Sequence, residues 1–365
     1  MRPASMPASL ITKTPAYDAA DPATDATPFG DLPVWRLSDL YPAMDSTELA
    51  DDFKWLEAEI TSFAADYQGN LTTLGGDALA ETLRRFEAIQ RKAGRIMSYA
   101  GLLYQQNTTD PARGKFLADC DDRWTTISAP MVFFSLELNR IQGNALEAAF
   151  AQSPALERYR PWFDNLRAMR PHQLSDELET YQHDMGVVGS TAWNRLFDET
   201  MAGLKFNVDG DEMNLEATLN LMTDAARDKR AAGAAALSAT FAANLPLFSR
   251  ITNTLAKEHE IECRWRKLPT PQASRHLANQ VEPEVVQALR DSVVAAYPDL
   301  SHRYYALKAK WLGLDKLQHW DRNAPLPEAD EAPISWTDAR RIVTEAYGGF
   351  HPRMAELAEP FFDNG

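Results

Sequence analysis

Cysteine is scarce in this chain of 365 residues. Its only two cysteines, Cys120 and Cys263, stand far apart, so they form neither a disulfide framework nor a paired-cysteine zinc site. Cys120 shares a helical stripe with Phe116, Trp124 and Ile127, which favours a buried thiol in the core. This cysteine usage suits a reducing compartment, and we therefore expect the protein to be cytoplasmic.

Long apolar runs and clusters of basic residues are also missing. No stretch is long and apolar enough to span a membrane, so we expect no membrane partner. The net charge is −15, and Lys and Arg are interspersed with acids, which argues against binding to nucleic acid. Residues 1–30 lack the continuous apolar region of a signal peptide and are rich in Pro, Ala, Thr and Asp, so we expect a flexible tail there.

The common motifs of hydrolases and nucleotide-binding proteins are missing as well. The segment GVVGST, at 186–191, has neither the Gly-x-Ser-x-Gly spacing of a nucleophilic serine nor the Gly-Lys-Ser/Thr ending of a phosphate-binding loop. Neither cysteine is surrounded by a catalytic signature. None of the seven histidines pairs with another at positions i and i+4, so no His-Glu-x-x-His sequence occurs.

The single His-Glu pair offers one alternative metal site. His259 and Cys263 are four residues apart and would share a helix face, with Glu260 available as a base. However, spacing assigns no acidic third ligand, and an amphipathic helix with His and Cys facing a core or groove explains the same pattern. The structural interpretation is favoured, and the sequence therefore assigns no catalytic, cofactor-binding or metal-binding residue.

What the sequence does contain is helical periodicity. Leu49, Phe53, Leu56, Ile60 and Phe63 lie on one helix face, and Gly69 is placed to end that helix. The pattern predicts further helices at 79–107, from about 111 into the apolar run 131–141, from 283 to a stop at Pro298, at 336–347 and at 352–362. Residues 224–244, rich in Ala with Gly233, predict a helix packed closely in the interior. The fold class is therefore mainly α.

One strand signal interrupts the helices. Residues 204–208 alternate in polarity and are followed by Asp209-Gly210, so 204–216 predicts a β-hairpin. Just before it, Ser175 is a candidate N-cap for a helix that Gly186 and Gly189 would break. We therefore expect a helical unit at 31–203 and a second, incomplete helical unit at 204–365.

The helix at 302–313 combines aromatic and basic residues. The pattern places Tyr304 and Trp311 on its apolar stripe and leaves Arg303, Lys308 and Lys310 in water, with Gly313 ending the helix. Such a helix could line a ligand groove, but packing of the stripe in a core with a solvated opposite face is favoured.

Several segments together resemble oligoendopeptidase F, of the thimet-oligopeptidase type of zinc metallopeptidase. LPVWRLSDLYP (32–42) looks like the opening segment of those proteins, and LSDELE (174–179) with STAWNRLFDETMAGLKF (190–206) resembles their linking segment. DAARDKRAAGAAAL (224–237), HRYYALKAKWLGLDKL (302–317) and APISWTDARRIVTEAY (332–347) resemble the first helices of their catalytic domain. No single segment is a catalytic motif, but their order and number make the resemblance specific.

The resemblance implies a helical zinc endopeptidase that cleaves short peptides. In that family the zinc ligands lie in a His-Glu-x-x-His helix and a downstream glutamate, and none of them can be placed on this sequence. The resemblance therefore implies the N-terminal portion of such an enzyme, inactive by itself, with zinc in the complete enzyme and none expected in this chain. The alternative is a non-catalytic helical protein that binds peptides or other partners.

The two last helices carry apolar faces that include Ile342, Met354, Leu357 and Phe361. If a following domain normally covers them, this chain should show an exposed apolar patch in its C-terminal unit or should self-associate to hide it. The simpler alternative is that these helices fold back and close the core.

Overall fold

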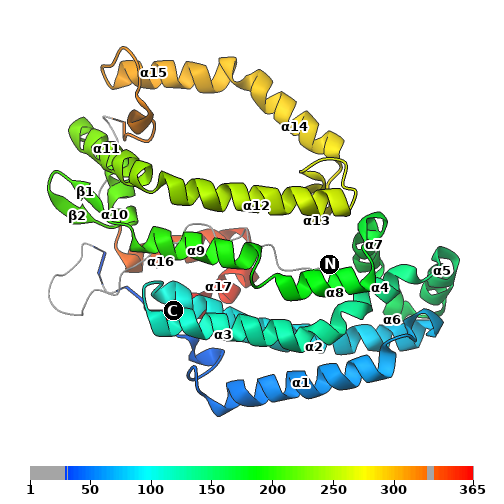
Figure 1. Cartoon of the computed structure of the whole chain (residues 1–365). Coiled ribbons are helices and arrows are strands. Elements are labelled where there is room, and N and C mark those ends of the chain that lie inside the picture. The colour runs from blue at the N-terminus through cyan, green and yellow to red at the C-terminus, as the bar shows by residue number, and fades with distance from the viewer. Residues whose placement is uncertain (1–28, 31, 327–332, 365) are drawn as a thin grey trace.

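The computed structural model describes residues 29–30, 32–326 and 333–364. The tail predicted for 1–30 therefore lies almost entirely outside the described residues. The described chain is mainly α-helical and contains a single two-stranded sheet, so the predicted fold class is confirmed. Figure 1 shows α1, α2, α9 and α12 as successive long rods, with α14 and α15 forming an arm above α12.

The first part of the chain is a group of packed helices. Its elements, in chain order, are η1 (Leu37–Asp39), α1 (Thr47–Tyr67), η2 (Leu71–Thr73), α2 (Gly76–Gln106), α3 (Pro111–Ser128), η3 (Ala129–Met131), α4 (Val132–Arg140), α5 (Gly143–Gln152), α6 (Pro154–Glu157), α7 (Arg160–Ala168), η4 (Arg170–His172), α8 (Asp176–Met185) and α9 (Ser190–Gly203).

The rest of the chain contains the sheet and a second series of helices. Its elements are β1 (Phe206–Val208), β2 (Asp211–Met213), α10 (Leu215–Asn220), η5 (Leu221–Thr223), α11 (Arg227–Ala243), α12 (Leu245–Trp265), α13 (Ala273–Asn279), α14 (Pro283–Ala296), the π-helical turn η6 (Pro298–His302), α15 (Arg303–Trp311), η7 (His319–Asp321), α16 (Trp336–Phe350) and α17 (Pro352–Asn364).

A single large core holds α1 to α7 together. The stripe predicted on α1 is buried throughout, from Leu49 to Phe63, and Ser46 caps the helix by accepting a hydrogen bond from the Leu49 amide. Aromatic rings fill the centre: the Phe134 ring lies 5.2 Å from that of Phe63 and 4.6 Å from that of Phe86. Cys120 is buried in the same core, as predicted.

One helix boundary differs from the predicted one, and proline explains it. The helix from Pro111 does not continue into 131–141, because Pro130 interrupts it in η3 and α4 starts afresh at Val132. The predicted stop at Pro298 is confirmed, since α14 ends at Ala296. The chain then continues through the π-helical turn η6, which begins at Pro298, directly into α15.

The predicted hairpin is present, with Phe206 paired to Met213 and Val208 to Asp211. Both turn residues have positive φ, 54° at Asp209 and 102° at Gly210, as a type I′ turn requires. Phe206 and Val208 are buried in a second, smaller cluster with Ala236 and Leu237 of α11. The prediction of close packing at Gly233 is also confirmed, since a Cβ there would lie 3.0 Å from Leu221.

The last elements contribute almost nothing to either core. No residue of α14 or α16 is buried, and Leu357 and Phe361 of α17 are 57% and 76% exposed. Leu357 and Phe361, which the prediction names, are thus exposed and belong to neither core, while a contiguous patch and self-association of the chain stay predictions. Ser335 caps α16 by accepting a hydrogen bond from the Asp338 amide, as its sequence predicted.

In the part of the chain that the structure describes, no single helix meets the length and apolarity needed to cross a membrane. α11 and α12, bent by 67°, meet that measure only when taken together.

Candidate functional site

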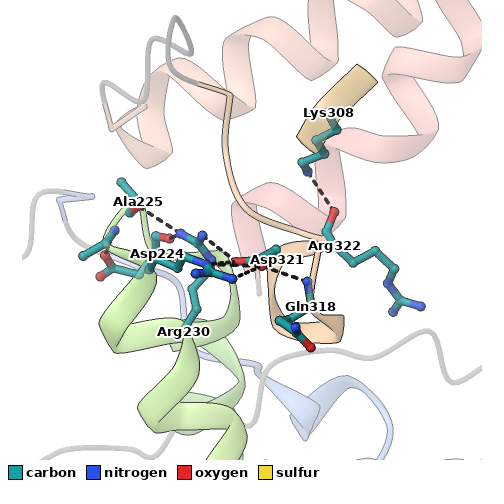
Figure 2. Close-up of polar contacts among 9 residues, drawn as sticks. Asp224, Ala225, Arg230, Lys308, Gln318, Asp321 and Arg322 are labelled. Atoms are coloured by element: carbon teal, nitrogen blue, oxygen red, sulfur yellow. Dashed lines mark hydrogen bonds and ion pairs between the residues drawn. The ribbon is translucent and has the colours of Figure 1, made fainter. Parts of the chain in front are cut away.

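The most concentrated group of buried charges lies where α11 meets η7 (Figure 2). Asp321 is fully buried and accepts hydrogen bonds from the Arg227 Nη2 and Arg230 Nη2 atoms, both at 3.0 Å. Its Oδ2 also accepts from the Gln318 amide at 2.9 Å. Three donors from two elements far apart in the sequence therefore hold this carboxylate, which we call, with Arg227 and Arg230, the Asp321 clasp.

The clasp is electrically unbalanced. Burial alone would raise the pKa of Asp321, but the hydrogen bonds from Arg227, the Gln318 amide and Arg230 outweigh it and lower that pKa to about 2. Lys308 is also buried and donates from Nζ to the Arg322 carbonyl at 2.8 Å. Its pKa is lowered by burial and by the nearby Arg230 guanidinium. One carboxylate thus faces three cations, which keeps it ionised throughout the physiological range.

This arrangement corrects the prediction for the aromatic-basic helix. Lys308, expected in water, is 4% exposed, while Tyr304 and Trp311, expected on a buried stripe, are 44% and 46% exposed. The reason is tertiary: the ammonium group of Lys308 donates a hydrogen bond to the backbone carbonyl of Arg322, which directly follows η7. The predicted helix end is confirmed, since Gly313 has φ of +67°.

A pocket of about 400 Å³ lies beside the clasp, between α15 and η7. Its wall includes the polar side chains of Tyr305, Lys316, His319 and Arg322. In Figure 2 the Arg322 side chain points away from Asp321. Hence the same short turn places one charged residue in the interior and the next at the pocket.

A second buried ion pair joins the first group of helices to α12. Glu179 of α8 accepts from the Nη1 and Nη2 atoms of Arg266 at 2.8 and 2.9 Å, and both side chains are buried. Burial would raise the pKa of Glu179, but the bonds from Arg266 contribute to lowering it to about 2. Arg266 also donates to Gln182 and to the His172 carbonyl. This pair fixes the end of α12 against α8.

The alternative metal site does not have the chemistry of one. The structure does bring His259 and Cys263 together, with 3.5 Å between Nε2 and Sγ. However, the His259 Nε2 lies 2.7 Å from the Pro271 carbonyl oxygen, which can only accept, so this nitrogen donates a hydrogen bond there instead of offering a lone pair to a metal. Burial raises the pKa of the Cys263 thiol, and Glu260 is ion-paired to Lys257 and Arg264. The His-Cys pair therefore anchors the loop after α12.

Other groups also serve structural contacts. The His183 Nε2 atom lies 3.1 Å from the Ser128 hydroxyl oxygen and from the Thr125 carbonyl oxygen, and thereby ties α8 to α3. Glu137, buried in the first core, accepts from the Gly69 and Leu71 amides. Within the described ranges no group of three or more His, Cys, Asp or Glu side chains is arranged to hold a metal ion.

No spacing pattern in the sequence identified the residues that form these polar centres. Arg230 lies in a helix with several other charges, Arg266 directly follows α12, and Asp321 ends the short turn η7. Spacing cannot identify such partners, because 91 residues separate Arg230 from Asp321 and 87 separate Glu179 from Arg266. The one usable signal was the Pro-bounded segment after α15, in which Asp321 is preceded by an aromatic and followed by a basic residue.

Comparisons with known proteins place these features in a wider context. The family model described as Oligopeptidase F matches residues 137–206. Group B oligopeptidase PepB of Streptococcus agalactiae is 24% identical over 297 residues, which are 78% of this chain and 49% of that protein. Oligopeptidase PepF of Bacillus subtilis is 20% identical over 336 residues, 90% of this chain and 49% of that protein. The chain thus spans about half the length of these relatives.

A solved structure gives the same result for the fold. Oligoendopeptidase-F from Enterococcus faecium superposes with a TM-score of 0.70 at 21% sequence identity, covering 87% of this chain and 66% of that one. At that identity the likeness establishes the fold alone. It extends over both groups of helices described above.

Proposed function

We propose, from the premise that this chain is oligoendopeptidase F-like in sequence and fold, that it forms part of an enzyme that hydrolyses short peptides. The observation that carries the proposal is the extent of the alignment. Between 78% and 90% of the chain aligns with two proteins named oligopeptidases, while those proteins continue for as long again. Fold alone would not justify a function, since one fold hosts many; the sequence relatives supply the support.

The role we assign to this chain is that of a framework rather than a reaction centre. The resemblance implies a zinc ion in the complete enzyme, which would supply an activated water. The described residues do not fit that ion: His259 and Cys263 are committed to the contacts given above, and no third ligand is near them. The Asp321 clasp and the ion pair between Glu179 and Arg266 instead hold α11, α12 and η7 in fixed positions.

A metal measurement tests this division of roles. The purified chain should contain well under one equivalent of zinc after dialysis, measured by mass spectrometry, and should not cleave a quenched fluorescent oligopeptide. His259→Ala and Cys263→Ala variants should have the same zinc content as the parent. One equivalent of zinc, lost in either variant, would overturn the assignment of that pair as structural.

The peptidase proposal itself is tested in the genomic context. The coding sequence after codon 365 should be determined, and any continuation expressed together with residues 1–365. A His-Glu-x-x-His segment in that continuation, and peptide cleavage that stops when a chelator is added, would support the proposal. A continuation without such a segment, and without peptide cleavage, would contradict it.

The second candidate is a non-catalytic helical protein that binds a partner, and the exposed apolar side chains of α14 favour it. Val285, Leu289 and Val293 are 53%, 65% and 45% exposed and lie four residues apart along one face of α14. If the peptidase proposal holds, the remaining part of an oligoendopeptidase F-like fold covers this face. The relatives contain that part in the half of their length that is not aligned here. Self-association of the chain through this face is the competing outcome.

The cellular location follows from the same proposal. Both cysteines are free and buried, which is compatible with a reducing compartment, and we propose that the protein acts in the cytoplasm. Separation of cell fractions followed by detection with an antibody against the chain tests this location. Recovery of the chain outside the cytoplasmic fraction would contradict it.

A further inference from the structure

The pocket between α15 and η7 has the character of an anion site. Lys316 and Arg322 both line it and are exposed, and neither forms an ion pair among the residues that the structure describes. His319 adds a third nitrogen-bearing side chain to the wall, and Asp315 is the single acid. The two cations outnumber the one acid at this pocket, although the protein as a whole carries a net charge of −15.

The pocket also has an apolar part to its lining. Ala306, Ala309 and Leu317 line it together with Tyr305. A ligand whose carboxylate meets the cationic side chains would therefore also contact small apolar side chains. This combination suits the end of a short peptide.

The Asp321 clasp explains how the cationic wall is held in place. η7 is only three residues long, yet its last carboxylate is bound by two arginines and the Gln318 amide. The carbonyl of the following residue, Arg322, is bound by the buried Lys308. Burying charge in this way is costly. These hydrogen bonds hold the backbone at 318–322, so His319 and Arg322 are presented at defined positions, which lowers the entropy cost of binding.

We propose that this pocket binds the carboxylate of a short peptide, with Arg322 and Lys316 as the contacting cations and Asp321 as a positioning residue. The proposal rests on the proposed function for the identity of the ligand, because an oligopeptide-cleaving enzyme handles peptides with free ends. The carboxylate could belong to the C-terminus or to an acidic side chain, and the geometry of the pocket suits both.

The experiment compares three probes on the full chain at low ionic strength. The probes are fluorescent Ala-Ala-Leu with a free C-terminal carboxylate, the same peptide as its C-terminal amide, and Ala-Glu-Leu amide, measured by anisotropy titration. We expect the free acid to bind about fivefold more tightly than the amide, the effect of one charged hydrogen bond at an exposed site. Tighter binding of Ala-Glu-Leu amide than of Ala-Ala-Leu amide would assign the site to acidic side chains as well.

Substitutions then test which residues cause the preference for the free acid. Arg322→Gln should abolish the preference for the acid, while Lys310→Gln, an exposed lysine of α15 that does not line the pocket, should retain it. Asp321→Asn should weaken the preference without removing either contacting cation, and circular dichroism must show that this variant is folded. If it is not folded, Lys316→Gln replaces it as the second variant and should reduce the preference.

Three results would overturn the proposal. These are equal affinity for all three probes, no binding of any probe, and an equal loss in Arg322→Gln and Lys310→Gln. Each of them leaves the peptidase proposal standing, because that proposal is decided by cleavage in the continued polypeptide. Conversely, a failure of cleavage with the preference for the acid intact would indicate a peptide-binding protein without catalysis.

Discussion

The N-terminal and C-terminal helices of this molecule differ in how their apolar faces are covered. In α1 to α7, apolar stripes at helical spacing meet one another and form a core that includes Phe63, Phe134 and Phe163, each no more than 1% exposed. In α14 to α17, stripes of equal regularity remain in solvent, and the buried positions there are Lys308, Ala309, Asp321 and Ala324. Periodicity predicts a helix with an apolar face in both cases, but it does not say whether a partner is present.

Different kinds of interaction therefore hold the helices together in different parts of this protein. The first region is stabilised by apolar burial. By contrast, α11 combines its apolar contact with the hairpin with a buried ion pair to η7, and a second buried ion pair joins the end of α12 to α8. Apolar packing tolerates small shifts, whereas a buried ion pair demands fixed geometry and fails when one partner is lost. The predictions below test this difference.

The largest effect is expected in the first core. Phe134→Ala should lower the free energy of unfolding by about 3–5 kcal/mol, because it removes a buried ring and leaves a cavity between Phe63 and Phe86. Phe361→Ala, at a side chain 76% exposed, should change it by less than about 0.5 kcal/mol. Urea titration followed by circular dichroism measures both. Similar losses in the two variants would abolish the distinction between the regions.

The second-largest loss of stability is expected when one partner of a buried ion pair is removed. Glu179→Gln removes the buried carboxylate that Arg266 binds and leaves only its ion pair with the half-exposed Glu262, so it should cost about 3 kcal/mol in the free energy of unfolding. The double variant Glu179→Leu with Arg266→Met should recover much of that loss, because no charge then remains buried. If the double variant is as unstable as the single one, the contribution of the pair is not electrostatic.

Acid should release the same pair. The folded-state pKa of Glu179 is lowered to about 2, so its ionised form contributes stability above the unfolded pKa of about 4.5, and that stability is lost as the pH falls towards 2. The stability of the parent chain relative to the double variant should therefore decline between pH 4.5 and 2 and stay constant from pH 5 to 7. A difference that is independent of pH would rule out this linkage.

The hairpin should respond more weakly. Gly210→Val places a β-branched residue at φ of +102° and should cost about 1–3 kcal/mol. Gly101→Ala is the matched control: Gly101 lies inside α2, where an added Cβ meets no atom within 4 Å, and the change should stabilise by up to about 1 kcal/mol. Thermal melts of the two variants should shift in opposite directions.

The smallest change in folding stability is expected on the exposed face of α14. Leu289→Glu should alter the free energy of unfolding by less than about 0.5 kcal/mol, since this side chain is 65% exposed. It should nevertheless reduce binding of an apolar dye and any self-association seen by light scattering. Gln287→Glu adds the same charge at a polar position of the same helix and should leave both signals unchanged.

Local chemistry allowed much of the architecture to be predicted from the sequence. The stripe from Leu49 to Phe63, the turn at Asp209-Gly210 and the cap at Ser335 are decided by residues close in the chain, so their patterns are legible without a partner. The local effects of Pro130 and Pro298 were harder to predict. A proline can break a helix, kink it or lie in a π-helical turn, and the packing of neighbouring residues selects among these.

Local patterns in the chain predict that it is helical, that it carries one hairpin and that its C-terminal helices have apolar faces. Contacts between distant segments settle which of those faces are covered, that Lys308 is buried while Trp311 is exposed, and that Asp321 meets Arg227 and Arg230. The physical reason is the distance along the chain over which each effect acts. Helix periodicity and turn preference arise between residues a few positions apart, whereas burial and ion pairing depend on which distant segment arrives at the same place.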